Sequence, residues 1–158
     1  PVAALPETGS YVARNSAGVP IVVVRDNQGT IRAFRNACRH RGMKLADGNG
    51  CTKIFRCNYH GWAYRLDGRL EYVPHEHGFP ELDKESNGLV PVHAVEVQSG
   101  LVFVTQDEPI GLGALESLPR LLTDDQVVFD SNETVEEANW KLTAEATLEG
   151  YHLSLIHI

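Results

Sequence analysis

The sequence predicts a mainly β protein, in which an antiparallel β domain is followed by the first strand and helix of a truncated α+β domain. Two observations predict this. Valine, isoleucine, tyrosine and phenylalanine recur in short runs separated by turn residues over residues 20–105, as β-strands prefer. Beyond them, a strand-like run and then a helix-forming run replace this pattern. We therefore expect a β domain at 1–106, a connector at 107–126 and the start of a second domain at 127–158.

Three hairpins are predicted inside the β domain. Strand-like runs flank Asn27–Gly29, the pair Asp67-Gly68, and Gln98–Gly100, and each of these segments contains a glycine that permits a tight turn. In the second domain, VVFDSNETVEEA is the expected strand. Asn139 is the expected N-cap of a helix that starts at NWKL, because an asparagine side chain can accept a hydrogen bond from the first turn.

The overall composition excludes several classes of protein. A formal net charge of −7 over 158 residues repels nucleic-acid phosphates, so we expect no nucleic-acid partner. No run approaches the roughly 18 apolar residues that cross a bilayer, so no membrane partner is expected either. Three cysteines in a chain of this size argue against a disulfide framework. We find no sequence feature that points to secretion, and we therefore expect a cytoplasmic location.

Cysteine and histidine occur together in two short segments. CRHRG contains Cys38 and His40, CNYHGW contains Cys57 and His60, and sixteen residues lie between His40 and Cys57. Both segments fall between predicted strands, so each loop supplies one thiol and one imidazole. A zinc finger also uses two cysteines and two histidines, but it normally places its histidines on a helix. Zinc, or no metal at all, stays open as an alternative.

The pairing of one thiol with one imidazole per loop suits a [2Fe–2S] cluster that has two cysteines on one iron and two histidines on the other. Neutral imidazoles in place of thiolates raise the reduction potential from about −400 mV to between roughly −150 and +300 mV. Gly42 and Gly61 follow the two histidines closely. We expect them to let each loop turn tightly and to point backbone amides at sulfur. We expect three aromatic residues to pack around the loops: Tyr59, Trp62 and Tyr64.

The two segments and their spacing resemble the Rieske motif. CRHRG and CNYHGWAYRLDGRL are similar to the Rieske domain of bacterial oxygenase large (alpha) subunits, both aromatic-ring hydroxylases and amine or carnitine-type monooxygenases. Respiratory Rieske proteins carry an extra cysteine in each loop, where this chain has Met43 and Tyr59. Cys51, between the loops, has no role in this pattern, and we expect it to be a small buried residue.

The resemblance extends to the end of the chain. NWKLTAEATLEGYH resembles the segment that opens the oxygenase catalytic domain and leads into an acid-x-x-His-x-x-x-x-His iron motif. By position, Glu149 matches a catalytic carboxylate that bridges two subunits, and His152 and His157 match ligands of a mononuclear Fe(II). Glu149 departs from the more common aspartate. The third iron ligand and most of the substrate pocket lie further downstream in that family.

The resemblance implies a Rieske-type mono- or dioxygenase. A reductase or ferredoxin would supply electrons from NAD(P)H, and O₂ and a small organic substrate would react at the iron. The full-length protein would assemble as a homotrimer or an (αβ)₃ complex, with electron transfer between subunits. The alternative is a Rieske ferredoxin-type electron carrier without catalysis, which has no use for residues 127–152.

The last residues raise a separate question. LSLIHI, residues 153–158, resembles the translation of a sequencing-adapter end, and the chain begins with proline. We therefore expect an N-terminal fragment that is inactive alone, with residues 153–158 a read-through scar. In that case His157 matches the iron motif only by coincidence.

Overall fold

The structure is a computed structural model that describes residues 1–158 apart from 17, 98–99, 109–111, 124, 131–136 and 149–158. The chain divides into two compact units, Pro1–Val128 and Phe129–Ile158. The first unit contains all the strands among the described residues. Within the part of the chain that the structure describes, no helix is both long and apolar enough to cross a bilayer.

A six-stranded sheet is the main feature of the first unit, and its strand order is β4-β1-β2-β3-β8-β9. Every neighbouring pair is antiparallel. The strands are β1 (Ser10–Ser16), β2 (Val19–Arg25), β3 (Ile31–Arg35), β4 (Asn49–Cys51), β8 (Pro91–Val97) and β9 (Leu101–Thr105). Two of the predicted hairpins, β2–β3 and β8–β9, are confirmed by this pairing, and the prediction of an antiparallel β protein is also confirmed.

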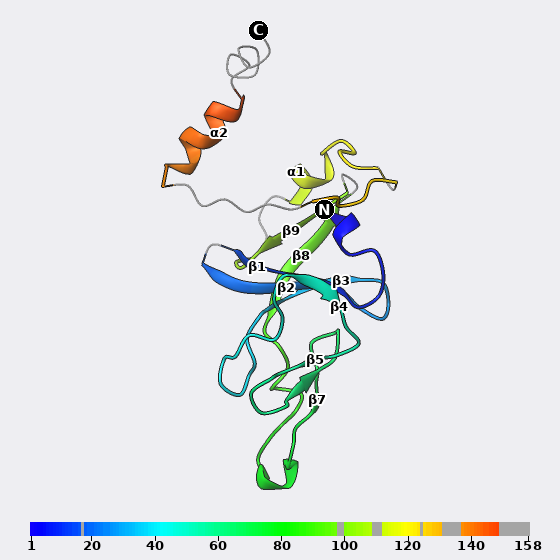
Figure 1. The fold of residues 1–158 in the computed structure, drawn as a ribbon, viewed down its shortest axis with the longest axis vertical. Helices are drawn as coiled ribbons and strands as arrows, with labels where there is room; N and C mark the ends of the chain where they lie inside the picture. The colour runs from blue at the N-terminus through cyan, green and yellow to red at the C-terminus, as the bar shows by residue number, and fades with distance from the viewer. Residues whose placement is uncertain (17, 98–99, 109–111, 124, 131–136, 149–158) are drawn as a thin grey trace. The chain divides into compact units, whose positions relative to one another are not determined.

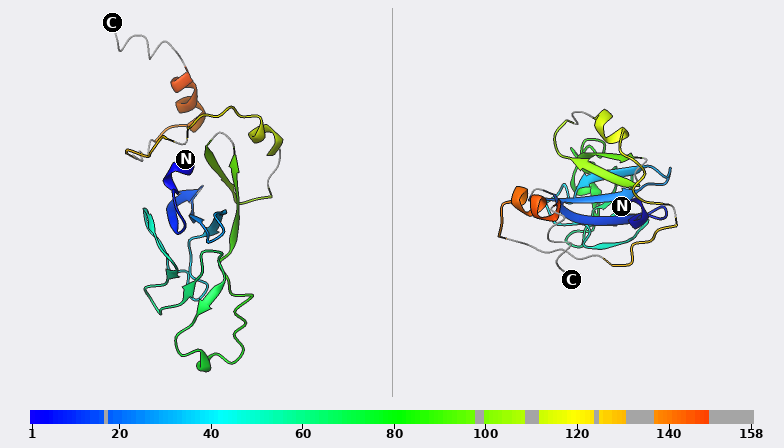
Figure 2. Two further views of the ribbon diagram at one scale, coloured as in Figure 1. Left: turned by 90° about the vertical axis from the view of Figure 1, so that its right-hand side faces the viewer. Right: turned by 90° about the horizontal axis from the view of Figure 1, so that it is seen from above.

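A second, three-stranded sheet lies below the larger one in Figure 1, and the view turned by 90° in Figure 2 agrees. It consists of β5 (Phe55–Arg56), β6 (Ala63–Tyr64) and β7 (Leu70–Tyr72), in that order. The third predicted hairpin, around Asp67-Gly68, joins β6 to β7 and is confirmed, with a register shift between Ala63 and Tyr64. A 3₁₀ helix, η2 (Glu76–Gly78), follows in the loop that returns to β8.

The main hydrophobic core joins the two sheets. Val22 and Val24 of β2 and Phe34 of β3 pack with buried residues of the small sheet and its loops. Because successive side chains of a strand point to opposite faces, Ile21 and the partly buried Val23 contribute to a second, smaller cluster. Burying side chains of this size contributes about 1.5–3 kcal/mol each. The two sheets are therefore held together by their side chains, and the loops between them are anchored at both ends.

The remaining elements are short helices. A 3₁₀ helix, η1 (Val2–Ala4), opens the chain, and α1 (Leu112–Glu116) lies in the expected connector. In the second unit, α2 (Trp140–Leu148) follows Asn139, whose Oδ1 accepts a hydrogen bond from Lys141 N at 3.0 Å. The predicted N-cap is therefore confirmed. Of the expected strand, residues 127–130 adopt no strand, and residues 131–136 lie outside the described residues.

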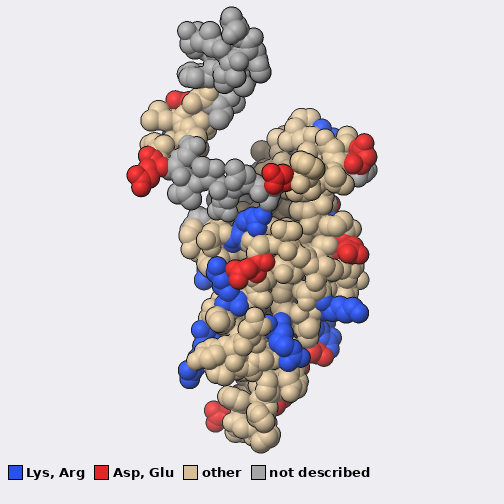
Figure 3. Space-filling view, in the orientation of Figure 1, with Lys and Arg blue, Asp and Glu red and all other residues tan. Residues whose placement is uncertain are grey.

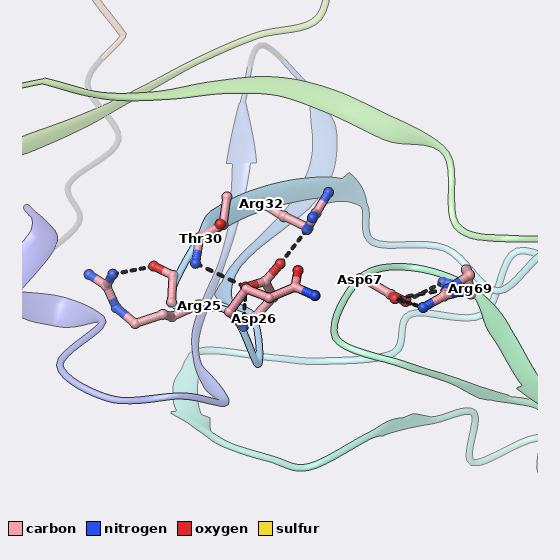
Figure 4. A network of polar contacts seen from close by, with 8 residues as sticks. Arg25, Asp26, Thr30, Arg32, Asp67 and Arg69 are labelled. Atoms are coloured by element: carbon pink, nitrogen blue, oxygen red, sulfur yellow. Dashed lines mark hydrogen bonds and ion pairs between the residues drawn. The ribbon is translucent and has the colours of Figure 1, made fainter.

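A buried carboxylate closes the turn between β2 and β3 (Figure 4). Asp26 is 1% exposed, and its Oδ1 accepts hydrogen bonds from the backbone N–H groups of Gln28 at 2.8 Å and Thr30 at 2.9 Å. Its Oδ2 accepts a hydrogen bond from Arg32 Nε at 2.6 Å. Burial alone raises the pKa of Asp26, but the hydrogen bonds from Arg32 and the two amides outweigh it and lower the pKa below its ordinary value.

Replacement of this carboxylate tests its contribution to stability. We expect Asp26→Asn to lower the free energy of unfolding at pH 7 by about 1–3 kcal/mol, because Arg32 and the turn amides lose a charged acceptor. Since folding lowers the pKa of Asp26, its contribution is present above about pH 3.9 and is lost as the pH falls through the folded pKa. The difference between Asp26→Asn and the parent, measured by urea unfolding, should shrink from pH 7 to pH 3.

The matched control is Asp47→Asn, which removes a carboxylate whose side chain is 83% exposed and pairs with Lys44 at 3.5 Å. Exposed pairs contribute little, so we expect a change below about 0.5 kcal/mol at either pH. An equal loss for both variants would contradict the role of Asp26.

Candidate metal centre

Two loops present the cysteines and histidines, and both use the same backbone hydrogen bonds. The N–H of Cys38 donates to Met43 O at 2.8 Å, and the N–H of Cys57 donates to Trp62 O at 2.7 Å. In each loop, the backbone N–H of the cysteine donates a hydrogen bond to the carbonyl oxygen of the residue five positions later. The two loops therefore have equivalent closures, although they differ in sequence and the histidine stands two residues after one cysteine and three after the other.

A glycine four residues after each cysteine completes the turn. Gly42 N donates to Cys38 O at 2.8 Å, and Gly61 N donates to Cys57 O at 3.0 Å. Both glycines have positive φ, 71° and 78°, which L-residues with a side chain rarely adopt. The expectation of tight turns is confirmed. The amides of the two glycines themselves bind the carbonyl oxygen of the cysteine, and the expectation that backbone amides of the loops point at sulfur stays a prediction.

The loops bury their thiols and bring their imidazoles together. Cys38 and Cys57 are 4% and 3% exposed and belong to the main core. His40 is half-buried and His60 is exposed, and their ring centroids are 4.7 Å apart. The indole of buried Trp62 stacks on His40, with centroids 5.1 Å apart and planes 8° apart. Each loop therefore has a sulfur on the protein side and a histidine at the surface.

One buried asparagine holds the first loop closed. Asn36 is 2% exposed, and its Oδ1 accepts hydrogen bonds from Leu45 N at 2.9 Å and Ala46 N at 3.2 Å. Its Nδ2 donates to Ala46 O at 2.6 Å. A single side chain thus joins the start of the loop, at the end of β3, to its far end, and this fixes the span that contains Cys38 and His40.

A buried tyrosine contacts the first cysteine directly. The hydroxyl of Tyr64, on β6, lies 3.3 Å from Cys38 Sγ and accepts a hydrogen bond from Arg39 N at 2.9 Å. Tyr64 is fully buried, and burial raises its pKa well above the ordinary value, with the hydrogen bond to Cys38 adding to the effect. The phenol therefore stays protonated, and its proton is directed at the sulfur whenever Cys38 is a thiolate.

The histidine side of the site disfavours positive charge on the imidazole. Burial lowers the pKa of His40, and the neighbouring His60 and Arg41 lower it further. A lowered pKa keeps the ring neutral at neutral pH, and the neutral imidazole is the form that binds a metal.

The donor set fits a [2Fe–2S] group by its chemistry. In the described part of the chain, no three His, Cys, Asp or Glu side chains converge closely enough to hold one metal ion. A two-iron cluster does not require such convergence, because its ligands attach in pairs to different irons. Two buried thiols, one with a hydroxyl beside it, and two imidazoles on the open side match that pairing.

Some predicted residues are found elsewhere. Cys51 is exposed on β4, so the expectation that it is buried is wrong; it occupies an edge strand of the large sheet rather than the core. The sequence predicts only that Tyr64 packs near the loops, and it gives no signal for the role of Asn36. Glu149, His152 and His157 lie outside the described residues.

Comparison with known proteins decides between the possible cofactors. Residues 1–94 match the family described as the Rieske [2Fe-2S] domain. The chain belongs to the Rieske [2Fe–2S] domain family. Residues 123–158 match the catalytic domain of the ring-hydroxylating alpha subunit. The chain therefore contains a Rieske domain followed by a segment that matches this catalytic domain, and the resemblance inferred from the motifs is confirmed.

Relatives of the Rieske domain and its continuation include monooxygenases and dioxygenases. The chain is 39% identical to the glycine betaine monooxygenase oxygenase subunit of Chromohalobacter salexigens, covering 97% of this chain and 36% of the relative. It is 38% identical to the biphenyl 2,3-dioxygenase subunit alpha of Rhodococcus jostii, covering 89% and 33%. A solved quaternary ammonium Rieske monooxygenase superposes with a TM-score of 0.63 at 34% identity, covering 66% and 28%. The chain spans about a third of the length of these curated relatives.

Removal of the asparagine bridge should loosen the Rieske loop. We expect Asn36→Ala to lower the free energy of unfolding by about 2–3 kcal/mol, because it leaves buried amide and carbonyl groups of the loop unpaired. It should also lower the iron bound per chain after purification. Iron analysis and thermal unfolding measure both effects. The control is Asn58→Ala. Asn58 is an exposed asparagine of the second loop, and its side chain makes no hydrogen bond within the part of the chain that the structure describes. Equal losses of stability and of bound iron in the two variants would contradict the role of the Asn36 side chain.

Proposed function

We propose that this chain is the electron-accepting part of a Rieske-type terminal oxygenase, which uses O₂ to hydroxylate a small organic substrate. The observation that carries the proposal is the presence of both matches in one chain, the Rieske domain at 1–94 and the catalytic domain at 123–158. The relatives are oxygenase subunits, which supports the same class.

Within the Rieske domain, we assign Cys38 and Cys57 to one iron and His40 and His60 to the other. When bound, the cluster accepts and releases one electron at a time. The protein contributes the surroundings: the core around the two cysteines excludes water from the sulfur side, while the imidazoles reach the surface. A redox partner can therefore approach most closely at the histidines.

The proposal for the second domain rests on sequence. Glu149 keeps the role of a carboxylate that bridges two subunits, and His152 that of a ligand of a mononuclear Fe(II). His157 is the second histidine ligand only if residues 153–158 are native rather than a read-through scar. A third carboxylate ligand would come from downstream of this chain. Glu149 and His152 stand three residues apart, which on a helix would place them on one face.

The partners follow from the same assignment. Electrons would come from NAD(P)H through a reductase or ferredoxin, and the full-length protein would form a homotrimer or an (αβ)₃ assembly. Inter-subunit electron transfer is described for the solved quaternary ammonium Rieske monooxygenase, which supports a shared site here. The relatives are named for quaternary amines, aromatic hydrocarbons or aromatic acids, so the substrate class stays open among these three.

A Rieske electron carrier without catalysis is the second candidate. Its Rieske domain would be built in the same way, so the loops do not separate the two functions. The match of residues 123–158 to an oxygenase catalytic domain favours the oxygenase, because a carrier needs no such segment.

Spectroscopy tests the ligand assignment. After anaerobic reduction, we expect the EPR signal of a histidine-coordinated [2Fe–2S] cluster; the signal of an all-cysteine cluster, or none, would refute it. Cys57→Ser should abolish the signal and the bound iron. Cys51→Ser changes the exposed cysteine and is the matched control, so its signal should be unchanged.

The tyrosine hydroxyl should set the potential of the cluster. We expect Tyr64→Phe to lower the reduction potential by roughly 60 mV, because a hydrogen bond to Cys38 Sγ of about 1.4 kcal/mol that favours the reduced state corresponds to 59 mV for one electron. A spectroscopic redox titration measures it. Tyr59→Phe is the control, since Tyr59 is 55% exposed and its ring only stacks on His60. An unchanged potential in Tyr64→Phe would exclude this role.

A further inference from the structure

A second pair of histidines lies outside the two cluster loops. His75 and His77 flank Glu76 in the segment VPHEHGFP, which contains the 3₁₀ helix η2 between β7 and the chain that returns to β8. Both histidines are exposed. Their ring centroids are 6.0 Å apart and their planes are nearly perpendicular, at 89°. Neither ring has a role in the proposed iron–sulfur centre.

The backbone that carries this pair has a defined conformation. His75 has φ 53° and ψ 42°, and it is the only non-glycine residue with positive φ in the part of the chain that the structure describes. Such a conformation is uncommon for a residue with a side chain, and it often marks a functional position. Gly78 N donates to His75 O at 2.8 Å, and Lys84 Nζ lies 2.6 Å from Glu76 Oε2. The turn is therefore held by its own hydrogen bonds and by an ion pair to the returning chain.

The separation of the two rings suits one shared metal ion. A metal–nitrogen bond to histidine is about 2.1 Å and an imidazole nitrogen lies about 1.1 Å from its ring centroid, so two imidazoles on one ion have centroids at most about 6.4 Å apart. The 6.0 Å between His75 and His77 is within this limit. The rings of His40 and His60, which we assign to one iron, are 4.7 Å apart and meet the same limit. Because both side chains of the η2 pair are exposed, their rings can turn toward a common ion without displacing core residues.

The surroundings of the pair are acidic. Residues 75–88 contain four Asp and Glu against one basic residue, Lys84. Figure 3 shows acidic side chains at the lower end of the first unit, where Figure 1 places η2. The field of these carboxylates attracts a cation to the turn. In the described part of the chain, no third His, Cys, Asp or Glu converges with the two rings, so the carboxylates act at a distance and the imidazoles are the ligands.

We propose that His75 and His77 form a surface site for a divalent transition-metal ion, separate from the iron–sulfur centre. The ion takes two imidazole ligands from one turn and completes its coordination with water. Imidazole suits copper, nickel and zinc, whereas Mg²⁺ and Ca²⁺ prefer oxygen ligands. Among the divalent ions, Cu²⁺ binds most tightly to such a site, and Ni²⁺ binds less tightly than Cu²⁺. The site does not depend on the proposed function, because neither histidine belongs to the cluster loops.

The test uses the purified chain with its cluster loaded and oxidised, and Ni²⁺ alone is the probe. All proteins carry Cys51→Ser, so that no exposed thiol competes for the metal. Calorimetry gives the stoichiometry and the Kd, and iron analysis checks that the cluster stays intact. We expect one Ni²⁺ per chain. His75→Asn, which keeps a residue that tolerates the left-handed backbone, and His77→Asn should each weaken binding at least tenfold, because even the loss of a group that only supports a ligand costs about 10–100-fold.

The control is His93→Asn, the same substitution at an exposed histidine of β8; its Kd should stay within about twofold of the parent, because the two positions share no ligand. With half an equivalent of Cu²⁺, the EPR spectrum of the oxidised protein should show coupling to imidazole nitrogen that both variants of the pair lose. No Ni²⁺ binding in the parent, an unchanged Kd in His75→Asn and His77→Asn, or an equal loss in His93→Asn would overturn the proposal. So would Mg²⁺ binding as tight as that of Ni²⁺, because the carboxylates would then be the ligands.

Discussion

The site depends on two loops that each fold back on a buried cysteine. The backbone N–H and carbonyl of Cys38 are hydrogen-bonded within its own loop, and the same is true of Cys57. These hydrogen bonds fix both cysteine backbones without the help of a metal. Their thiols are in the core that joins the two sheets. Since the sulfurs occupy the protein side, the histidines can lie only on the outer side. This arrangement leaves the imidazoles accessible to solvent, buries the sulfur side of the site and brings His40 into contact with His60.

The surroundings of the loops act on different parts of the site. Asn36 spans the first loop from β3 to its far end, which makes the position of Cys38 depend on the large sheet. Tyr64 belongs to the small sheet and contacts the same cysteine through its hydroxyl. The two sheets therefore meet at one sulfur. On the open side Trp62, itself buried, stacks against His40 and links the imidazole to the core.

Local patterns are sufficient to predict much of the fold. Each hairpin is predicted from turn residues between strand-forming runs, because short-range sterics decide whether the chain can reverse there. Asn139 is predicted as an N-cap for the same reason, since a cap bonds within its own first turn. Long-range features are not accessible in this way. The spatial order β4-β1-β2-β3-β8-β9 depends on packing between residues far apart in sequence. The same holds for the small sheet, whose strands come between β4 and β8 in the sequence.

The sequence by itself determined which cysteines and histidines are proposed as iron ligands, how they are paired on two loops, and which family they resemble. Those facts depend on residue type and spacing, which a sequence contains in full. Only the tertiary structure decided where these groups lie: that Cys51 is exposed while Cys38 and Cys57 are buried, that the glycine amides bind carbonyls rather than sulfur, and that Asn36 and Tyr64 support one loop from two sheets. Burial and hydrogen-bond partners are set by contacts between distant segments, and no local pattern in the chain specifies them.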